Sequence, residues 1–335
     1  MTRHFLPALF LGVLASACSI EAVTRPSPPP VDWQSLEARP SPPGSAMTAT
    51  AKERAATDAY LKALASPGFT DLGRILDEDA HFTFAGFKDV HGRDKVIRSH
   101  QALLGGFVSR TFVLSRVFLT DSSQIVEWTM SGTHEASRKP VTIKGLALLW
   151  TKDDGTISNV HLYFDQALAN AQVGAGPKAL LGLAPPQLPS GPRQEVEQTL
   201  NPEETANVAV VRALLDALEN KNEAAYLAAM ADDVEVTTLA STSPVRGKIE
   251  VRGTLKAMHK AIAQLDTSID NIWGIGPFVV VEYHIVGEQR GPIGWIPAPK
   301  DSLLKMFVVD VVELQGGKIA RLWRYDNPSQ ILAVP

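Results

Sequence analysis

An internal repeat constrains the fold of this 335-residue chain more than any other feature of its sequence. Val90-His91-Gly92 returns 155 residues later as Val245-Arg246-Gly247, and Ile125–Trp128 returns at the same offset as Val280–Tyr283. Repeats this long are whole domains, because solenoid units span only about 20–50 residues. The length also fits about two domains. The sequence therefore predicts one fold built twice in tandem.

The amino-terminal segment has the composition of a targeting signal. Arg3 is followed by an apolar run from Phe5 to Ala17, too short to span a bilayer, and the run ends at Cys18, the only cysteine. Residues 1–18 resemble a bacterial lipoprotein signal peptide, with Cys18 as the lipidated residue that carries palmitate and other acyl chains. A cleaved secretory signal with an incidental cysteine is the alternative.

The lipoprotein resemblance implies a location and a partner. A lipid on Cys18 would anchor the chain in a membrane of the bacterial cell envelope, and Ser19 after it is typical of sorting to the outer membrane, facing the periplasm. The formal net charge of −4, with acidic and basic residues interspersed, argues against nucleic-acid binding.

Two proline-containing segments divide the rest of the chain. Residues 19–47 are a Pro-rich tether, whose composition cannot bury a core and favours extended polyproline II. Residues 173–201 mix glycine and proline and are typical of a linker between domains. The folded domains are therefore expected at 48–172 and 202–335.

Each repeat has the same predicted order of elements. An amphipathic helix is followed by a short helix, a brief strand and a third helix after the Val-X-Gly turn. Four long strands at hairpin spacing follow in the first copy, at about 111–120, 124–135, 140–152 and 156–167. Helices followed by an antiparallel meander predict an α+β fold, in which helices cover one face of a sheet.

Two strands carry a resemblance to a known family. The segments Glu127–His134 and Tyr163-Phe164-Asp165-Gln166 resemble the polyketide cyclase (SnoaL-like) branch of the nuclear transport factor 2-like superfamily. The second copy is similar through Glu282–Gly287 and Tyr325-Asp326-Asn327. The resemblance implies two tandem cone-shaped domains, each with three helices on a curved, mainly antiparallel sheet that encloses an apolar pocket. Because this fold hosts isomerases, cyclases, dehydratases and binding modules, it does not fix a function.

The candidate catalytic residues are Asp165, His134 and His100. Periodicity places His100 on the inner face of the third helix, and the resemblance puts Asp165 at the position of the family's terminal acid. A buried aspartate beside a histidine can act as a general base, because desolvation raises its pKa. Four further side chains are expected to line the ligand pocket: Trp128, Met130, His161 and Tyr163.

Each catalytic candidate also has a structural interpretation. Asp165 could cap the turn after the last strand, His100 could be a hydrogen-bonded core residue, and His134 could lie at the rim. The second copy has other residues where the first has histidines. The expected equivalents of His100, His134 and His161 are Leu255, Gln289 and Leu322, in that order. Asp165 alone is expected to persist, as Asp326.

These patterns favour a protein without catalysis. The expected function is an envelope lipoprotein with two SnoaL-like domains that binds a small apolar ligand or a protein partner. The alternative is a cyclase, isomerase or dehydratase with Asp165 as its base. No cofactor is expected, because phosphate-loop and dinucleotide motifs are absent, and no metal, because the candidate histidines lack ligand spacing. The copies are also expected to form an intrachain pseudo-dimer, with the loop Gln289–Asp301 packed on the first domain.

Overall fold

The computed structural model describes residues 51–85, 89–241, 243–297 and 302–333. All of them lie in one compact unit, Ala46–Pro335. The signal peptide and the tether expected at 1–47 fall outside the described residues. None of the helices in the described ranges is both long enough and apolar enough to cross a membrane.

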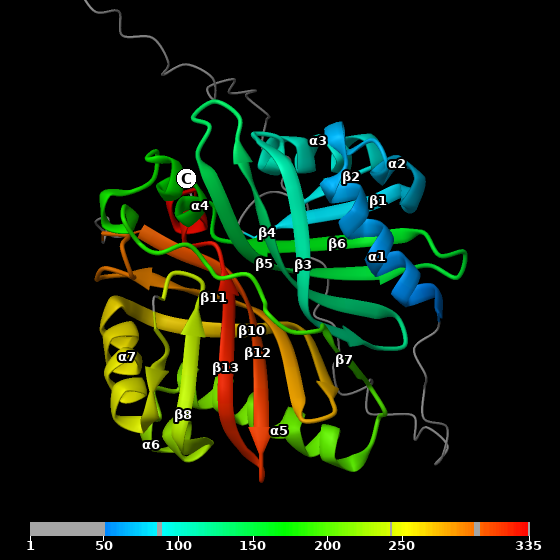
Figure 1. The fold of residues 1–335 in the computed structure, drawn as a ribbon. Helices are drawn as coiled ribbons and strands as arrows, with labels where there is room; N and C mark the ends of the chain where they lie inside the picture. The colour runs from blue at the N-terminus through cyan, green and yellow to red at the C-terminus, as the bar shows by residue number, and fades with distance from the viewer. Residues whose placement is uncertain (1–50, 86–88, 242, 298–301, 334–335) are drawn as a thin grey trace, which may run out of the picture. The chain divides into compact units, whose positions relative to one another are not determined.

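The first domain begins with helices and continues into long strands (Figure 1). Its elements are α1 (Ala51–Ala65), η2 (Pro67–Phe69), α2 (Leu72–Ile75), β1 (Leu76–Phe84), β2 (Val90–His91), α3 (Arg93–Leu104), β3 (Phe107–Leu119), β4 (Ser123–His134), β5 (Pro140–Thr151), β6 (Ile157–Phe164), α4 (Gln166–Val173), η3 (Lys178–Leu180) and β7 (Gln194–Glu197). The strands form one sheet in the order β2-β1-β6-β5-β4-β3-β7.

The second domain repeats this arrangement. Its elements are α5 (Pro202–Glu219), α6 (Glu223–Ala228), β8 (Met230–Thr238), β9 (Val245–Arg246), α7 (Gly247–Ala261), β10 (Ile262–Ile275), β11 (Phe278–Gln289), β12 (Ser302–Gln315), β13 (Lys318–Asp326) and η4 (Pro328–Ala333). The sheet order is β10-β11-β12-β13-β8-β9, which matches the first sheet without β7. The α+β prediction is confirmed for both copies.

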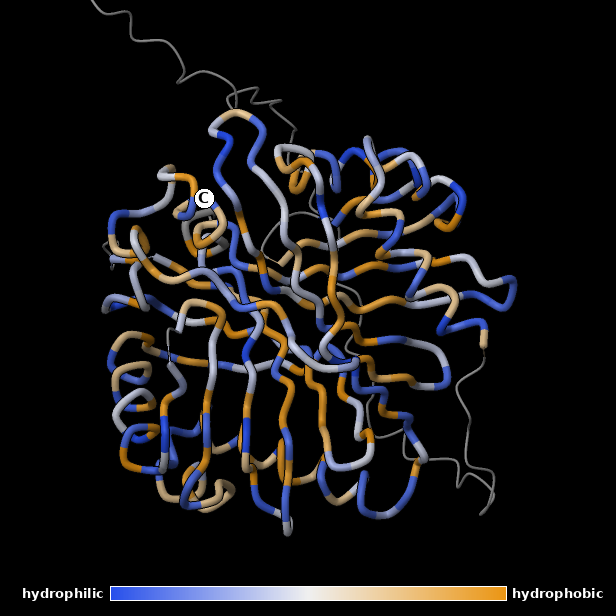
Figure 2. The backbone as a smooth tube through the Cα atoms, in the orientation of Figure 1, coloured by the Kyte–Doolittle hydropathy of each residue, from blue (hydrophilic) through white to orange (hydrophobic). Residues whose placement is uncertain are grey.

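Local sequence explains where these elements lie. In α1, the buried residues Tyr60, Leu61 and Leu64 recur at helical spacing and join the core of the first domain. α5 begins after a capping box, in which Asn201 Oδ1 accepts from the Glu204 N–H at 2.8 Å and the Glu204 carboxylate accepts from the Asn201 N–H. Figure 2 shows apolar residues gathered along the strands and hydrophilic residues at many of the turns.

The hydrogen-bond register shows how the two copies correspond. One row of directly opposed residues in the first sheet is Glu127, Leu146 and Tyr163. The same row in the second sheet is Glu282, Val309 and Tyr325. Tyr163 and Tyr325 are therefore equivalent.

This register corrects the correspondence expected for the last strand. His161 corresponds to Trp323, and its expected pairing with Leu322 is wrong by one residue. Asp165 likewise corresponds to Asn327, and its expected pairing with Asp326 is wrong. The aspartate at the end of the first sheet is therefore not kept in the second.

The two sheets meet through the faces that their helices leave uncovered. One apolar cluster contains Ala85, Phe118, Ile125, Leu146, Leu148 and Tyr163 from the first domain, and Ile275, Phe278, Val280, Val309, Val311 and Tyr325 from the second. The opposite face of each sheet packs on its own helices. The central strands are thus covered on both sides, which explains why β4 is buried continuously from Ser123 to Met130.

The segment between the domains is structured. β7 pairs in parallel with β3 and extends the first sheet, and Arg54 Nε in α1 lies 3.1 Å from Glu195 in β7. Trp295, in the loop after β11, packs against Ala167, Ala171 and Leu180. The packing of this loop on the first domain is therefore confirmed for its described part, whereas residues 298–301 lie outside the described residues.

Candidate ligand-binding site

The inner face of the first sheet is filled by its own side chains. Trp128 and Met130 are fully buried in the core of the first domain. The Trp128 indole lies over Gly145 on β5, where a Cβ atom would come within 2.3 Å of the ring. The same two positions hold Tyr283 and Val308 in the second domain, a smaller ring opposite a larger neighbour. Both interiors are therefore closely packed at this point.

His100 is a buried core residue of α3. Its Nδ1 lies 2.8 Å from the Val96 carbonyl oxygen and its Nε2 lies 2.9 Å from the Tyr60 hydroxyl oxygen. Because a carbonyl can only accept, Nδ1 carries the proton and Nε2 accepts from Tyr60. Burial lowers the pKa of His100 to about 4, so its ring is neutral at pH 7. Both ring nitrogens are thus hydrogen-bonded to other residues of the core.

His134 lies at the end of the β4–β5 hairpin. Its Nδ1 is 2.9 Å from the Ser137 hydroxyl oxygen, within the turn that joins the two strands. It pairs with the first residue of β3, as Gln289 pairs with the first residue of β10. The expected equivalence of His134 and Gln289 is therefore confirmed.

Asp165 is the N-cap of α4. Its Oδ1 accepts a hydrogen bond from the Leu168 N–H at 3.0 Å, as Asn327 Oδ1 accepts from the Ser329 N–H in the second domain. Its Oδ2 is buried and has no hydrogen-bond partner among the described residues. Burial raises the pKa of Asp165, while its backbone hydrogen bond acts in the opposite direction.

The three candidate catalytic residues are not brought together. Within the described part of the chain, no hydrogen bond, ion pair or ring contact joins any two of His100, His134 and Asp165. They lie in the helical core, on a hairpin turn and at the end of β6, respectively. This placement provides no acid–base pair within hydrogen-bond reach.

His161 and Tyr163 lie on the outer face of β6, against the second domain. His161 Nδ1 is 2.7 Å from Glu282 Oε1, and the Tyr163 hydroxyl donates to the same oxygen at 2.6 Å. Asn271 donates to the other carboxylate oxygen at 2.6 Å. Burial opposes ionisation of Glu282, but these hydrogen bonds hold its pKa below the usual range. His161 and Tyr163 therefore bind the second domain, on the face opposite to Trp128.

A related contact joins a tyrosine of the second domain to a glutamate of the first. The Tyr325 hydroxyl donates to Glu127, which also binds the guanidinium of Arg116, with Arg116 Nη2 at 2.8 Å. The same guanidinium lies over the Trp323 ring, 3.7 Å from its centroid. In each sheet, a buried glutamate thus accepts a hydrogen bond from a tyrosine hydroxyl of the other domain.

A groove of about 290 Å³ lies between the domains and the linker. It is lined by Lys144 from the first sheet, residues 184–187 of the linker, and residues 237–239 and 323–325 of the second domain. A narrower hollow shares Lys144, Pro186 and Leu239 with this groove and is also lined by Asp165. The groove and the hollow therefore adjoin.

Lys144 is one of two cationic residues in the groove lining. Its Nζ lies 5.7 Å from the centroid of the Tyr325 ring, and it has no hydrogen bond or ion pair within the described residues. Burial lowers the pKa of Lys144, with Glu127 acting in the opposite direction. By strand register the equivalent of Lys144 in the second sheet is Phe307, so the fold does not require a lysine here.

The second cation of the groove is already neutralised. Arg324 Nε and Nη2 donate to the two carboxylate oxygens of Asp310 at 2.9 and 2.8 Å, and Nη2 also lies 2.9 Å from the Tyr283 hydroxyl. The Lys144 ammonium therefore differs from Arg324, because none of its three N–H donors has an acceptor among the described residues.

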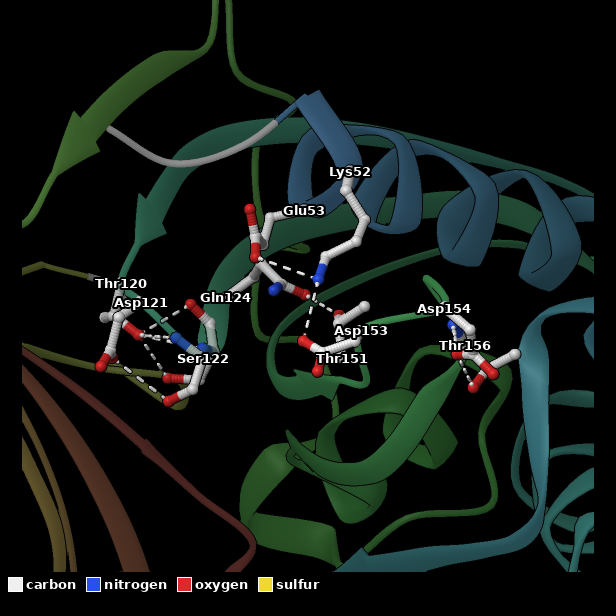
Figure 3. A network of polar contacts seen from close by, with 11 residues as sticks. Lys52, Glu53, Thr120, Asp121, Ser122, Gln124, Thr151, Asp153, Asp154 and Thr156 are labelled. Atoms are coloured by element: carbon white, nitrogen blue, oxygen red, sulfur yellow. Dashed lines mark hydrogen bonds and ion pairs between the residues drawn. The ribbon is translucent and has the colours of Figure 1, made fainter. Parts of the chain in front are cut away.

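A second polar cluster surrounds the start of α1 (Figure 3). Lys52 Nζ lies 4.0 Å from Glu53 and 3.8 Å from Asp153, and the Thr151 hydroxyl donates to Gln124 at 2.9 Å. These contacts join the helix to the ends of neighbouring hairpins. Both Glu53 and Gln124 are buried, and the Gln124 side-chain oxygen is satisfied by the contact with Thr151.

Both repeats match the model of one domain family. The SnoaL-like domain model matches residues 57–160 and 211–322, which together are more than half of the chain. The chain belongs to the SnoaL-like domain family. The expected resemblance is thus confirmed in both copies, each with the NTF2-like arrangement of helices on a mainly antiparallel sheet.

Several solved structures are similar to parts of this SnoaL-like protein. A candidate SnoaL-like polyketide cyclase of Jannaschia sp. CCS1 is 21% identical, with a TM-score of 0.37, and the match covers 41% of this chain and 99% of that one. A LEH-like epoxide hydrolase of M. tuberculosis is 22% identical, with a TM-score of 0.33, and the match covers 39% and 90%. A protein of Catenulispora acidiphila DSM 44928 with a ketosteroid isomerase-like fold, solved with trimethylamine, is 18% identical, with a TM-score of 0.32, over 37% and 89%. A search of curated proteins gives no match.

Sequence reasoning did not single out Lys144 as a binding residue. A lysine on the polar face of a strand is expected to be exposed to solvent. Lys144 is half-buried only because the second domain and the linker pack around it. Comparison of the two copies gave no signal either, because the sequence offset pairs Lys144 with Lys305. Only the strand register shows that Phe307 holds the equivalent position.

Proposed function

We propose that this SnoaL-like protein is a non-catalytic binding protein that takes up a small amphipathic anion in the groove between its domains. The observation that carries the proposal is the half-buried Lys144 ammonium, which lines the groove without a hydrogen bond or ion pair to a described residue. A half-buried ammonium has lost part of its hydration, and an anionic oxygen of a ligand would supply an acceptor.

The absence of catalysis is supported by what the family's pocket contains here. Trp128 fills the space over Gly145, and both nitrogens of His100 are bonded within the core. One oxygen of Asp165 holds the start of α4. None of these groups is presented together with another to a shared substrate.

The groove walls indicate the rest of the ligand. Pro185, Pro186, Leu239 and Trp323 offer apolar surface beside Lys144. A volume of about 290 Å³ lies at the lower end of the range for small-molecule sites. The chemistry that fits is a carboxylate, sulfonate or phosphate on a flat apolar body.

Two fluorescent probes test this site. Anilinonaphthalene sulfonate has an anionic group and an aromatic body, whereas N-phenyl-1-naphthylamine has the body without the charge. We expect Lys144→Met to weaken binding of the sulfonate about tenfold, the equivalent of about 1.4 kcal/mol, and to leave binding of the neutral probe within about twofold.

Lys305→Met is the matched control. Lys305 is exposed on β12 and lies 4.9 Å from the Phe307 ring centroid, so it has the same charge and an aromatic neighbour but lies outside the groove lining. It should bind both probes as the wild type does. Equal sulfonate affinity of the wild type and Lys144→Met would refute the proposal.

We further propose that lipid on Cys18 places both domains at the outer membrane, facing the periplasm. The support is the apolar run that ends at Cys18, followed by the Pro-rich tether at 19–47. We also propose that the packing of the two sheets replaces the contact that separate SnoaL-like chains would make with each other. The reciprocal contacts of Tyr163 with Glu282 and Tyr325 with Glu127 support this pseudo-dimer.

One observation favours an enzyme of cyclase, isomerase or dehydratase type as the second candidate. Asp165 Oδ2 is buried without a hydrogen-bond partner among the described residues, beside the hollow that Lys144 also lines. A carboxylate in that position could accept a proton from a ligand. Under this alternative, Asp165→Asn would abolish turnover of a ligand that still binds.

A further inference from the structure

Two histidines face each other across the first two strands of the first domain. His81 on β1 and His91 on β2 are directly opposed, with His91 Nδ1 3.3 Å from His81 Nε2 and the ring centroids 4.0 Å apart. The carboxylate of Asp89 joins them. Its Oδ2 lies 3.0 Å from His91 Nε2 and 3.9 Å from His81 Nδ1.

The second domain shows what this position needs for folding alone. Glu235 on β8 and Arg246 on β9 are directly opposed at the equivalent place and form an ordinary ion pair. Opposite charges across two strands stabilise the pairing, whereas two imidazoles gain little from each other unless they share a proton or a cation. The His81–His91 pair is therefore not a requirement of the fold.

We propose that His81, Asp89 and His91 bind a divalent transition-metal ion, with zinc as the best fit. One ligand atom from each residue lies within 4.8 Å of the others. A tetrahedral zinc ion, with bonds of about 2.0–2.2 Å, holds its ligand atoms about 3.4 Å apart, so small side-chain rotations complete the site. Two imidazoles and one carboxylate are the ligand types that zinc favours, and they leave a fourth position for water.

The surroundings hold the carboxylate in place. The Thr83 hydroxyl donates to Asp89 Oδ1 at 3.2 Å, which leaves Oδ2 directed to the histidines. Outer hydrogen bonds of this kind orient metal-binding carboxylates. His81 is half-buried, while Asp89 and His91 are exposed, so an ion can enter from solvent.

Spacing along the sequence did not predict this site. The three residues are spread over a strand, a turn and a second strand, and the strand pairing brings them together. The site is also separate from the groove around Lys144, because none of its three residues lines that groove.

A zinc titration of the full chain tests the proposal. We expect wild-type protein to bind one equivalent of Zn²⁺ in competition with a chelating dye. The double variant His81→Glu/His91→Arg places the pair of the second domain into the first, so it should fold while losing zinc affinity by at least about 100-fold. Cys18 is present in both proteins, so zinc bound by its thiol cannot account for a difference.

His284→Gln is the matched control. His284 Nδ1 lies 3.0 Å from Asp270, which gives a histidine and a carboxylate without a second histidine. This variant should bind zinc as the wild type does. Co²⁺ should give visible absorption bands in the wild type and in His284→Gln, and none in the double variant. Absence of saturable zinc binding by the wild type, or equal binding by the double variant, would overturn the proposal.

Discussion

His100 makes the stability of the first domain depend on pH. Its ordinary pKa of about 6.5 applies in the unfolded chain, and burial lowers the pKa to about 4 in the fold. The unfolded chain therefore binds the proton first. The stability that neutral His100 contributes is complete above about pH 6.5 and is lost as the pH falls towards 4, up to about 3 kcal/mol.

The double variant Tyr60→Phe/His100→Leu measures this contribution. His100→Leu installs the residue of the equivalent position Leu255, and Tyr60→Phe avoids leaving a buried hydroxyl without a partner. Between pH 7 and pH 4 we expect the free energy of unfolding to fall by about 3 kcal/mol less in the variant than in the wild type. Equal losses in urea denaturation would contradict the buried neutral histidine.

Predictability also differs between single residues. Helical periodicity was enough to place His100 on the inner face of its helix, because one helix and its own sheet decide that burial. The environments of Lys144 and His161 depend on a domain whose docking the local sequence does not encode. Their partners, Tyr325 and Glu282, lie more than 100 residues away.

At the scale of elements, Asp165 ends β6 and starts α4. Asp165→Asn keeps an oxygen for the Leu168 N–H, as Asn327 does in the second domain, so we expect the free energy of unfolding to stay within about 0.5 kcal/mol. Asp165→Ala removes the cap and should cost about 1 kcal/mol. Thermal denaturation of both variants checks this order. A loss in Asp165→Asn as large as in Asp165→Ala would show that the cap is not what the carboxylate supplies.

The order of the elements was predictable, but the correspondence of the last strand was not. Amphipathic helices, hairpin turns and long strands are local patterns, and they gave the α+β class correctly. The expected pairing of Asp165 with Asp326 rested only on both residues being aspartate. The connection between β11 and β12 is eight residues longer than that between β4 and β5, and the last hairpin is one residue shorter, so the offset on the last strand is 162 and Asp165 corresponds to Asn327.

At the scale of the whole molecule, the sheet-to-sheet packing and the proposed lipid anchor make one joint prediction. We expect the wild-type chain to fractionate with membranes and Cys18→Ser to be released into the soluble fraction. The released protein should sediment as a single chain, because each sheet is already covered by the other. A Cys18→Ser protein that stays with membranes would refute the anchor, and one that sediments as a dimer would refute the pseudo-dimer.

The groove exists because two domains of one family pack together and the linker covers one side. Neither domain carries it alone, and its one unpaired cation, among the described lining residues, has no equivalent in the second sheet. Duplication followed by asymmetry thus places the proposed binding site between the domains, whereas the first domain is closely packed around Trp128.

The most direct measurement is a crystal structure of the protein with bound anilinonaphthalene sulfonate. We predict density for the sulfonate beside Lys144 Nζ, with the rings between Pro185, Pro186 and Trp323. Density inside the first domain, next to Trp128 and His100, would contradict this placement and return the family's pocket to consideration as the functional site.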